Sequence, residues 1–504
     1  MTAPVLMVVG TASSVGKSVL VTALCRLFRQ DGVDVAPFKA QNMSNNADIT
    51  PDGLEIGRAQ SEQAAAAGLP AAVEMNPVLL KPQGDRTSQL VLNGRAAGTL
   101  TSGDFAQRTT LWPHVEAALE RLRGRHGLVV AEGAGSPAEP NLYATDIVNM
   151  RVARHAGAAT LLVGDIDRGG VFAHFVGTLA LLPPEDRALV RGLVINRFRG
   201  DEALLADAIA DVEGRTGVPV LGVVPWLPEL GVADEDAVAL ERPPATAEGR
   251  TATVDVAVVR FPRIANFDDF DPLAREPGVR LRYVERAADF GAPDLVVLPG
   301  TKATVADLGW MRGRGLDVAV HAHAAAGGHV LGVCGGLQML GRRLDDPDGV
   351  EAAPGTSVAG LGLLPLDTTF VGEKATRRVR GHVQAGRGAW AATRGLAVEG
   401  YEIHMGRSER GPGVEPLLRL EDGETMVEDG VVSLDGRVAG TYVHGLLHND
   451  ALRRTLLRSL GWRGDAAAES SAERREREFD RLAATVRAHL DVDALYAMLG
   501  LTRP

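Results

Sequence analysis

An apolar strand that runs into a glycine-rich loop opens this chain and restricts the fold it can adopt. Val5–Val9 is an uninterrupted apolar run, which is typical of a parallel strand buried on both faces. A loop, Gly10–Ser18, follows, and from Lys17 to Arg29 apolar residues recur at helical spacing. Because parallel strands are joined by long, usually helical, crossovers, this opening predicts a doubly wound α/β domain.

The same alternation of short apolar runs and helical stretches continues along most of the chain. In the first half we expect a helix at Ile56–Ala67 and strands at Val33–Phe38, Leu128–Ala131, Thr160–Val163, Leu193–Asn196 and Val220–Val224. In the second half we expect strands at Val254–Val259, Val279–Val284, Leu295–Leu298 and Val330–Val333. Since 504 residues exceed what one hydrophobic core normally holds, the length predicts two or three domains, and the pattern places an α/β domain in each half.

Changes in composition divide the chain into four parts. An acidic and proline-rich stretch at 233–252 is typical of a linker between a phosphate-loop domain, 1–232, and a second domain, 253–449. Glycine-rich sequence with short apolar segments at 355–445 indicates further β-structure. Residues 450–504 form a predicted helical extension, whose charged run from Ala472 is typical of a solvated helix face.

Composition and charge exclude several classes of protein. A net charge of -11 and an aromatic content of 4% argue against nucleic-acid binding. Only two cysteines are present, far apart in sequence, which indicates a reducing compartment. We find no signal peptide and no apolar run long enough to span a membrane, so we expect a cytoplasmic protein. The sequence leaves the oligomeric state open, a homo-oligomer included.

The loop after the first strand has the composition of a nucleotide-binding phosphate loop. Glycine allows backbone N–H groups to face phosphates, a lysine neutralises their charge, and a serine hydroxyl can ligate Mg²⁺. The predicted ATP-binding residues are Gly10, Thr11, Ser14, Val15, Gly16, Lys17 and Ser18. The spacing is one residue longer than G-x-x-x-x-G-K-[ST]. Ala12 occupies the position where partitioning-type switch ATPases carry an extra lysine, which disfavours that subclass.

Carboxylates after other strands are candidates for holding the metal ion. Glu132 ends the strand Leu128–Ala131, so it should lie near the loop, and with Ser18 it forms the predicted Mg²⁺ site. Asp52 is a weaker third candidate. Asp165 and Asp167 also follow a strand, and they either face the same crevice or cap the next helix; the sequence does not separate these alternatives.

A cysteine between glycines forms a second motif of chemical interest. In Gly332–Gly336 the sequence Gly-Val-Cys-Gly-Gly joins an apolar run to a helical one, which is typical of a nucleophile on a sharp turn. Cys334 is therefore the predicted nucleophile and His444 its base. Gly300 and Gly335 are predicted to donate oxyanion-hole N–H groups. The other cysteine, Cys25, lies among apolar helix residues and is expected to pack in the core.

Several stretches together resemble the cobyric acid synthase family, the glutamine-hydrolysing amidotransferases of cobalamin biosynthesis. The resemblance covers about residues 5–448, and its phosphate loop is similar to that of dethiobiotin synthetase, which accounts for the longer spacing. It rests on Ala36–Asn46, Glu55–Gln60, Met75–Pro82, Glu132–Pro137, Gly164–Phe172, Asn266–Pro272, Leu298–Lys302 and Tyr401–Gly406. The second domain would then be a class I glutamine amidotransferase of the cobyrinate type.

The resemblance also implies the roles of the cysteine and the histidine. Cys334 would attack glutamine, His444 would act as base, and ammonia would be released. Most class I domains carry a glutamate two residues after the histidine, but here Leu446 occupies that position. The cobyrinate branch is similar in this respect. We therefore expect a Cys–His dyad without a carboxylate to orient His444.

The activity implied by the resemblance is an ATP-driven amidation of a corrinoid. ATP would phosphorylate a carboxylate of adenosylcobyrinic acid a,c-diamide, and ammonia from glutamine would displace phosphate at the b, d, e and g side chains. The residues predicted to bind this substrate follow the second strand, and they are Lys39, Gln41, Asn42, Asn45 and Asn46. Their side chains suit contacts to its amides and carboxylates, and the alternative interpretation is an Asn-rich turn. Two alternatives are a cobyrinic acid a,c-diamide synthase and a non-enzymatic nucleotide switch with a glutaminase-like interaction domain.

Overall fold

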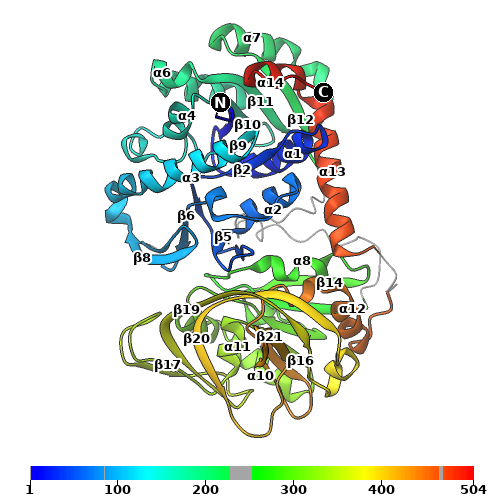
Figure 1. Ribbon diagram of the computed structural model, residues 1–504. Coiled ribbons are helices and arrows are strands. Elements are labelled where there is room, and N and C mark those ends of the chain that lie inside the picture. The colour runs from blue at the N-terminus through cyan, green and yellow to red at the C-terminus, as the bar shows by residue number, and fades with distance from the viewer. Residues whose placement is uncertain (1, 85, 228–252, 465–468) are drawn as a thin grey trace. The chain divides into compact units, whose positions relative to one another are not determined.

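A computed structural model of the chain describes residues 2–84, 86–227, 253–464 and 469–504 (Figure 1). The predicted linker at 233–252 lies outside these residues. The described chain forms two compact units. Unit 1 comprises Met1–Ser44, Leu54–Glu235 and Ala472–Pro504, and unit 2 comprises Asn45–Gly53 and Asp236–Ser471. Residues 45–53, from the predicted first domain, belong to unit 2. The predicted extension 450–504 is divided, with 450–471 in unit 2 and 472–504 in unit 1.

Unit 1 is built on a six-stranded parallel sheet in the order β12-β11-β10-β1-β9-β2. The strands are β1 (Val5–Gly10), β2 (Val35–Phe38), β9 (Leu128–Glu132), β10 (Ala159–Asp165), β11 (Val190–Phe198) and β12 (Val220–Pro225). Successive residues of β1 pack into different cores, since Val5, Met7 and Val9 face one and Leu6 and Val8 the other. Both faces are thus buried, which explains the continuous apolar run and confirms the doubly wound prediction.

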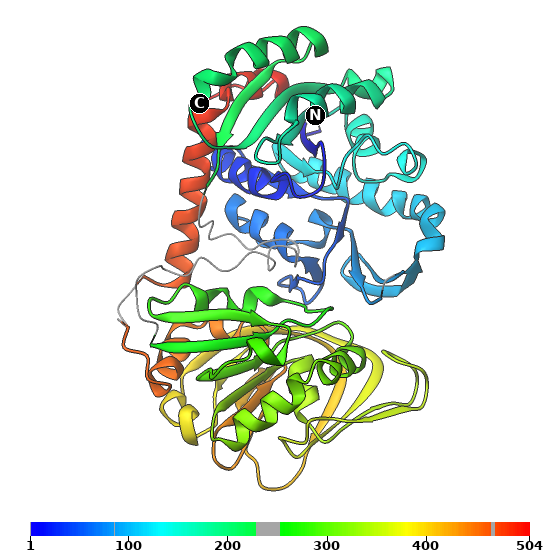
Figure 2. The ribbon, with the colours of Figure 1, turned by 180° about the vertical axis from the view of Figure 1, so that it is seen from behind.

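The helices of unit 1 include one pair from opposite ends of the chain. The helices are α1 (Lys17–Gln30), α2 (Arg58–Ala67), α3 (Trp112–Arg125), α4 (Met150–Ala156), α5 (Val171–Leu181), α6 (Pro184–Arg187), α7 (Ala206–Thr216), α13 (Ser471–His489) and α14 (Val492–Leu499). Helix α13 runs beside α1 in both views (Figures 1 and 2), and Arg26 of α1 pairs with Glu476 and Asp480 of α13. The charged run therefore makes ion pairs as well as facing solvent, and Phe479 beneath it is fully buried.

A small second sheet of unit 1 went unpredicted. Its order is β3-β6-β7-β8, with β3 (Gln41–Met43), β6 (Val78–Pro82), β7 (Thr87–Leu92) and β8 (Arg95–Thr101). Strand β3 pairs parallel with β6, while β6, β7 and β8 form an antiparallel meander. The short strand β5 (Glu55–Gly57) leads into α2.

Unit 2 carries a six-stranded sheet in the order β14-β13-β15-β16-β24-β23, in which only the β23–β24 pair is antiparallel. Its strands are β13 (Val254–Val259), β14 (Val279–Val284), β15 (Leu295–Leu298), β16 (His329–Val333), β23 (Val431–Val432) and β24 (Val438–Thr441). The helices are α8 (Asp271–Ala274), α9 (Thr304–Gly313), α10 (Leu316–Ala325), α11 (Gly335–Leu340) and α12 (Asp450–Ser459). The predicted second α/β region is confirmed.

The β-structure expected at 355–445 forms a further sheet of unit 2, in the order β18-β17-β19-β21-β22, with β20 paired to β19. Its strands are β17 (Arg343–Asp346), β18 (Thr356–Ala359), β19 (Leu366–Val383), β20 (Ala397–Arg410), β21 (Leu418–Asp422) and β22 (Thr425–Asp429). The strand β4 (Ala47–Ile49), although early in the sequence, also belongs to unit 2. Within the described residues, no helix is both long enough and apolar enough to cross a membrane.

Candidate functional site

The loop between β1 and α1 has the backbone that a phosphate site requires. Gly16 has φ +94° and Ser14 has φ +57°, both in the left-handed region. A side chain on Gly10 would collide with its surroundings, because a Cβ there would lie 2.6 Å from Val15 Cγ2 and 2.9 Å from Lys17 Nζ. Lys17 Nζ donates to the carbonyl oxygens of Ala12, at 3.0 Å, and Gly135, at 3.1 Å. The lysine thus lies over the loop, as a phosphate ligand would need.

Glu132 is the centre of a polar cluster beside this loop. Its Oε1 accepts from Ser18 Oγ and from Lys39 Nζ, each at 2.8 Å, and its Oε2 accepts from Gln63 Nε2 at 2.6 Å. Glu132 is only 1% exposed, so the ammonium of Lys39 compensates a buried charge. The structure therefore brings together the predicted Ser18, Glu132 and Lys39, and it adds Gln63, which sequence reasoning missed.

Asp52, the third predicted metal ligand, makes a hydrogen bond within its own turn. It lies in unit 2 in an exposed turn, where its carboxylate accepts from the hydroxyl of Thr50. Among the residues that the structure describes, no three His, Cys, Asp or Glu side chains gather as metal ligands. Ser18 and Glu132 alone offer two oxygens 2.8 Å apart, a spacing that suits a shared hard cation.

Asp165 makes a local turn and an ion pair. Its Oδ1 accepts from the backbone N–H of Asp167 at 2.9 Å, and its Oδ2 lies 2.8 Å from Arg197 of the neighbouring strand β11. Asp167 is 3.4 Å from Arg199. Neither carboxylate caps α5, which begins only at Val171. Of the two alternatives, the helix cap is therefore wrong.

The five residues predicted to bind the corrinoid substrate are divided between the two units. In unit 1, Asn42 Nδ2 donates to Gln60 Oε1 at 3.0 Å, and the buried Gln41 Oε1 has no hydrogen-bond partner among the described residues. Asn45 and Asn46 lie in unit 2. Asn46 Oδ1 accepts from the backbone N–H of Phe267 at 3.3 Å. Lys39, Gln41 and Asn42 are thus the part of the set that lies in the nucleotide unit.

Cys334 lies on a strained turn between β16 and α11. Its φ of +51° with ψ of -110° is a conformation that costs a non-glycine residue free energy and often marks a functional site. A Cβ on Gly336 would lie 1.9 Å from the carbonyl oxygen of Leu298, and one on Gly332 would lie 2.7 Å from the Gly336 backbone. Both flanking glycines are therefore required, and the sharp turn predicted at this cysteine is confirmed.

His444 is oriented by a carboxylate from a distant part of the sequence. Its Nδ1 donates to Asp269 Oδ2 at 2.7 Å, and Asp269 Oδ1 accepts from the Gly445 N–H, also at 2.7 Å. Cys334 is near enough to be among the groups that raise the pKa of His444. The expectation of a dyad is wrong, because Asp269 supplies the third member of a Cys–His–Asp arrangement.

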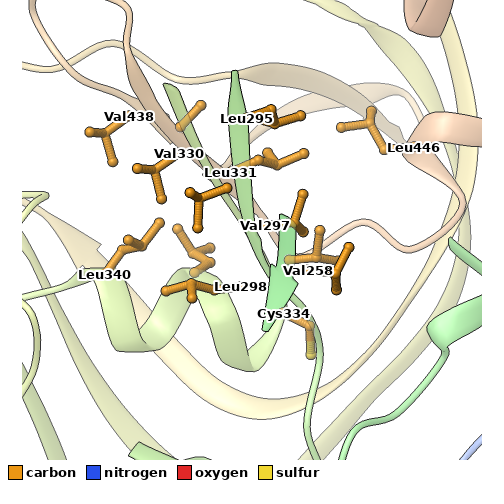
Figure 3. Packing of buried hydrophobic residues seen from close by; sticks show 14 of the residues in the cluster. Val258, Leu295, Val297, Leu298, Val330, Leu331, Cys334, Leu340, Val438 and Leu446 are labelled. Carbon is orange, nitrogen blue, oxygen red and sulfur yellow. The ribbon is translucent and has the colours of Figure 1, made fainter. Parts of the chain in front are cut away.

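Leu446, at the position where other class I domains have a glutamate, has a different role. It is 2% exposed and belongs to the same apolar cluster as Val258, Leu331 and Cys334, as Figure 3 shows. A carboxylate there would be buried among aliphatic side chains, which is costly. The carboxylate that contacts His444 belongs instead to Asp269, in the 3₁₀ turn Phe267–Phe270 just before α8.

The buried pair sets the protonation state of His444. Burial alone would lower the pKa of His444, but the charge and hydrogen bond of Asp269, together with Cys334, raise the pKa to about 10. The imidazole is thus protonated at neutral pH. A protonated imidazole can act as a general acid toward a leaving group.

Two glycines predicted to form the oxyanion hole lie beside these groups. A Cβ on Gly300 would lie 2.9 Å from His444 Cε1, and one on Gly335 would lie 2.8 Å from Thr301 Cγ2. The loop after β15 and the start of α11 therefore meet next to the cysteine and the histidine. The proximity is as predicted, whereas the role of their N–H groups stays a prediction.

Strand β20 lines the other side of this site. The ring of Tyr401 stacks on His444 with centroids 5.4 Å apart, and His404 stacks on Tyr442 at 3.8 Å. The thiol of Cys334 lies 3.6 Å from the carbonyl oxygen of Ile403. Burial lowers the pKa of His404, whose Nδ1 donates to the Gly406 oxygen at 2.9 Å, so this second histidine is neutral.

A strained cysteine, a buried His–Asp pair and a separate phosphate-loop unit define a nucleotide-dependent glutamine amidotransferase. Comparisons with known families agree. Residues 255–452 match the CobB/CobQ-like glutamine amidotransferase domain, and residues 6–239 match the CobQ/CobB/MinD/ParA nucleotide binding domain.

The relatives narrow the class to one family. A cobyric acid synthase of Roseiflexus castenholzii is 54% identical over 496 residues, covering 97% of each chain. One of Chloroflexus aurantiacus is 52% identical over 97% of this chain and 98% of its own, and one of Pelotomaculum thermopropionicum is 51% identical over 100% and 98%. This chain belongs to the cobyric acid synthase family, which confirms the prediction of a glutamine-dependent ligase.

Proposed function

We propose that the enzyme uses ATP and glutamine to amidate the b, d, e and g carboxylates of adenosylcobyrinic acid a,c-diamide, yielding adenosylcobyric acid. The observation that carries this proposal is the strained Cys334 in the same unit as the buried His444–Asp269 pair, whose Nδ1 and Oδ2 atoms lie 2.7 Å apart. The other unit of the chain bears a phosphate loop. The names of its relatives support the corrinoid product. The two units divide the work, one releasing ammonia and the other activating the acceptor.

Ammonia is released in unit 2. The thiolate of Cys334 attacks the carboxamide carbon of glutamine, and the oxyanion that forms accepts hydrogen bonds from the N–H groups of Gly300 and Gly335. Protonated His444 gives its proton to the leaving nitrogen, which departs as ammonia and leaves a thioester. Water, deprotonated by His444, then hydrolyses the thioester to glutamate and restores the thiolate. Asp269 keeps the imidazole oriented through both steps.

The acceptor is activated in unit 1. A carboxylate is a poor electrophile, so one of its oxygens first attacks the γ-phosphorus of ATP, and the bond to ADP breaks. Ammonia then attacks the carbonyl carbon of the acyl phosphate, and phosphate leaves as the amide forms. Residues 10–18 bind the phosphates, and the ammonium group of Lys17 neutralises their negative charge. Lys39, Gln41 and Asn42 contact the acceptor.

Ser18 and Glu132 would hold the Mg²⁺ that accompanies ATP. Their oxygens lie 2.8 Å apart at the carboxyl end of β9 and the start of α1, and the donor set of hydroxyl and carboxylate is one that Mg²⁺ prefers. A bound Mg²⁺ neutralises phosphate charge. Gln63 orients Glu132 from α2, and Asp52 stays a third candidate for the metal ion.

The test compares two nitrogen sources in Cys334→Ala. We expect this variant to lose glutamate release and glutamine-driven amidation, while amidation driven by ammonium chloride continues at the wild-type rate. Cys25→Ala removes the only other thiol, from a fully buried site in unit 1, and should retain both reactions. Loss of both reactions in Cys334→Ala, or glutamate release that survives it, would overturn the proposal.

A further inference from the structure

Residues 45–53 come from the first half of the sequence, but they belong to the glutaminase unit. They follow soon after Gln41 and Asn42, two of the residues predicted to bind the substrate. They form one compact body with the described part of residues 236–471. Arg378 of β19 holds them through a 2.7 Å hydrogen bond from its Nε to the Ile49 oxygen. Unit 2 is therefore incomplete without a segment that the phosphate-loop half supplies.

The segment is joined to the loop before α8 by two buried hydrogen bonds. The backbone N–H of Ala47 donates to Asn266 Oδ1 at 3.0 Å, and the backbone N–H of Phe267 donates to Asn46 Oδ1 at 3.3 Å. The four residues are between 0% and 4% exposed. Each asparagine thus satisfies a buried backbone donor of the other strand of chain, which would be costly to leave unpaired.

Asn266 holds the loop in a shape that places Asp269. Its backbone is left-handed, with φ +50° and ψ +45°, a conformation that asparagine tolerates better than most residues. Its carbonyl oxygen accepts from the Asp269 N–H at 3.1 Å, which closes the turn. Just before it, the Ala265 N–H donates to the oxygen of Gly300 at 2.9 Å. The turn therefore contacts two parts of the catalytic site.

We propose that Asn46 and Asn266 are positioning residues of the glutaminase, which hold the turn that carries Asp269 and thereby orient His444. The segment that the phosphate-loop half supplies then helps to set the rate of glutamine hydrolysis. This inference rests on the proposed function, because it assumes that Cys334, His444 and Asp269 hydrolyse glutamine. It assigns to Asn46 a role other than the substrate contact that its place in the sequence suggested.

The test uses two variants that approach the same contact from opposite sides. Asn266→Gly keeps the positive φ without strain and removes only the side-chain acceptor, and Asn46→Ala removes the partner acceptor. Glutamate release is measured on the full chain with ATP, Mg²⁺ and the corrinoid diamide. We expect kcat to fall about 10-fold to 100-fold in each variant, since small misplacements in catalytic geometry cost up to about 100-fold. The KM for glutamine should change less than about twofold.

The double variant and a control separate positioning from general damage. Because both bonds hold one turn, the double variant should lose little more activity than either single variant. Arg378→Met removes a contact that the segment makes with β19 instead, and it should keep more than about half of wild-type glutamate release. Thermal unfolding of each variant, followed by circular dichroism, should show a folded chain at the assay temperature.

Three results would overturn the inference. Wild-type kcat in Asn266→Gly is the first, and an equal loss in Arg378→Met is the second. The third is an Asn46→Ala variant that releases glutamate normally but shows a raised KM for the corrinoid in ammonia-driven amidation, since that marks Asn46 as a substrate contact. If Cys334→Ala itself still releases glutamate, the proposed function fails instead, and the two failures are thus distinguishable.

Discussion

The phosphate loop and the cysteine turn both place a reactive side chain where a parallel strand ends and a helix begins, but they recruit their partners differently. In unit 1, Lys17 and Ser18 open α1 directly after the loop. Lys17 donates to the Gly135 oxygen, and Ser18 donates to Glu132 at the end of the adjacent strand β9. In unit 2, Cys334 is local, but His444 comes from beyond β24, and its carboxylate, Asp269, lies 175 residues earlier.

This difference teaches where each function is encoded. A phosphate site consists mainly of backbone N–H groups and one lysine, so a short motif contains most of it. A nucleophile, its histidine and the orienting carboxylate need a fixed mutual geometry, and the fold brings these side chains together from separate loops. Variants of the phosphate site should therefore slow amidation with either nitrogen source. Variants of the cysteine site should slow only amidation driven by glutamine.

The largest effect is expected for Lys17→Met. Methionine keeps an unbranched stem but loses the ammonium that contacts the Ala12 and Gly135 oxygens. Amidation with either nitrogen source should fall at least about 1,000-fold, because charge on the transferred phosphoryl group is no longer compensated. Basal glutamate release at Cys334 should persist. Wild-type amidation by this variant with ammonium chloride would contradict the assignment.

Asp269→Asn is expected to act only on the glutamine reaction. Loss of the charge that orients His444 should lower kcat for glutamate release by about 100-fold to 10,000-fold. Ammonia-driven amidation should stay at the wild-type rate. Asp268→Asn, which changes the neighbouring carboxylate, is the matched control and should cost less than about tenfold. Equal losses in the two variants would contradict a specific role for Asp269.

The same variant tests the pKa of His444. In the native chain this pKa is raised to about 10, so the imidazolium persists through neutral pH, and glutamate release should decline only as pH approaches 10. In Asp269→Asn the alkaline decline should move to lower pH. The interactions that raise this pKa stabilise the folded state fully at pH values below the ordinary histidine pKa near 6.5. This contribution to stability is lost as pH rises through about 10. Unfolding midpoints measured across pH should show a smaller loss in the variant.

A smaller and purely structural effect is expected for Phe479→Ala in α13. Phe479 is fully buried in the core that also contains Cys25 and Phe28 of α1. Its truncation should cost about 3–5 kcal/mol of unfolding free energy, measured by urea titration. Leu204→Ala, at a site 81% exposed in the same unit, should stay within about 0.5 kcal/mol of the native chain. Equal stability of both variants would show that the C-terminal helices are not part of unit 1.

The strands and the reactive turns could be predicted because their signals are local. Runs such as Leu295–Leu298 are apolar throughout, since both faces of a parallel sheet are buried, and the structure has the same bounds. The small sheet of β3, β6, β7 and β8 was missed because strands such as Gln41–Met43 are short and polar. The long pair β19 and β20 was seen only as general β-structure, since its polar residues weaken any alternation.

Asp269 could not be predicted from spacing because its partner is set by tertiary structure. The acidic run Asp268–Asp269 was visible in a stretch that resembled the family, but no local rule relates it to His444. The same holds for Gln63, which lies in α2 and donates to Glu132 at the end of β9. Leu446 led us to expect no carboxylate beside His444, whereas Asp269 supplies one from a different part of the sequence.

The most direct measurement of the central claim is transfer of isotope from glutamine to the corrinoid. The full chain is incubated with amide-¹⁵N glutamine, ATP, Mg²⁺ and adenosylcobyrinic acid a,c-diamide, and the product is weighed by mass spectrometry. We predict one ¹⁵N for each amide formed, one ADP for each ¹⁵N, and no label in Cys334→Ala unless ¹⁵N-ammonium is supplied. A corrinoid that gains no mass, or that gains label from glutamine in Cys334→Ala, would contradict the account.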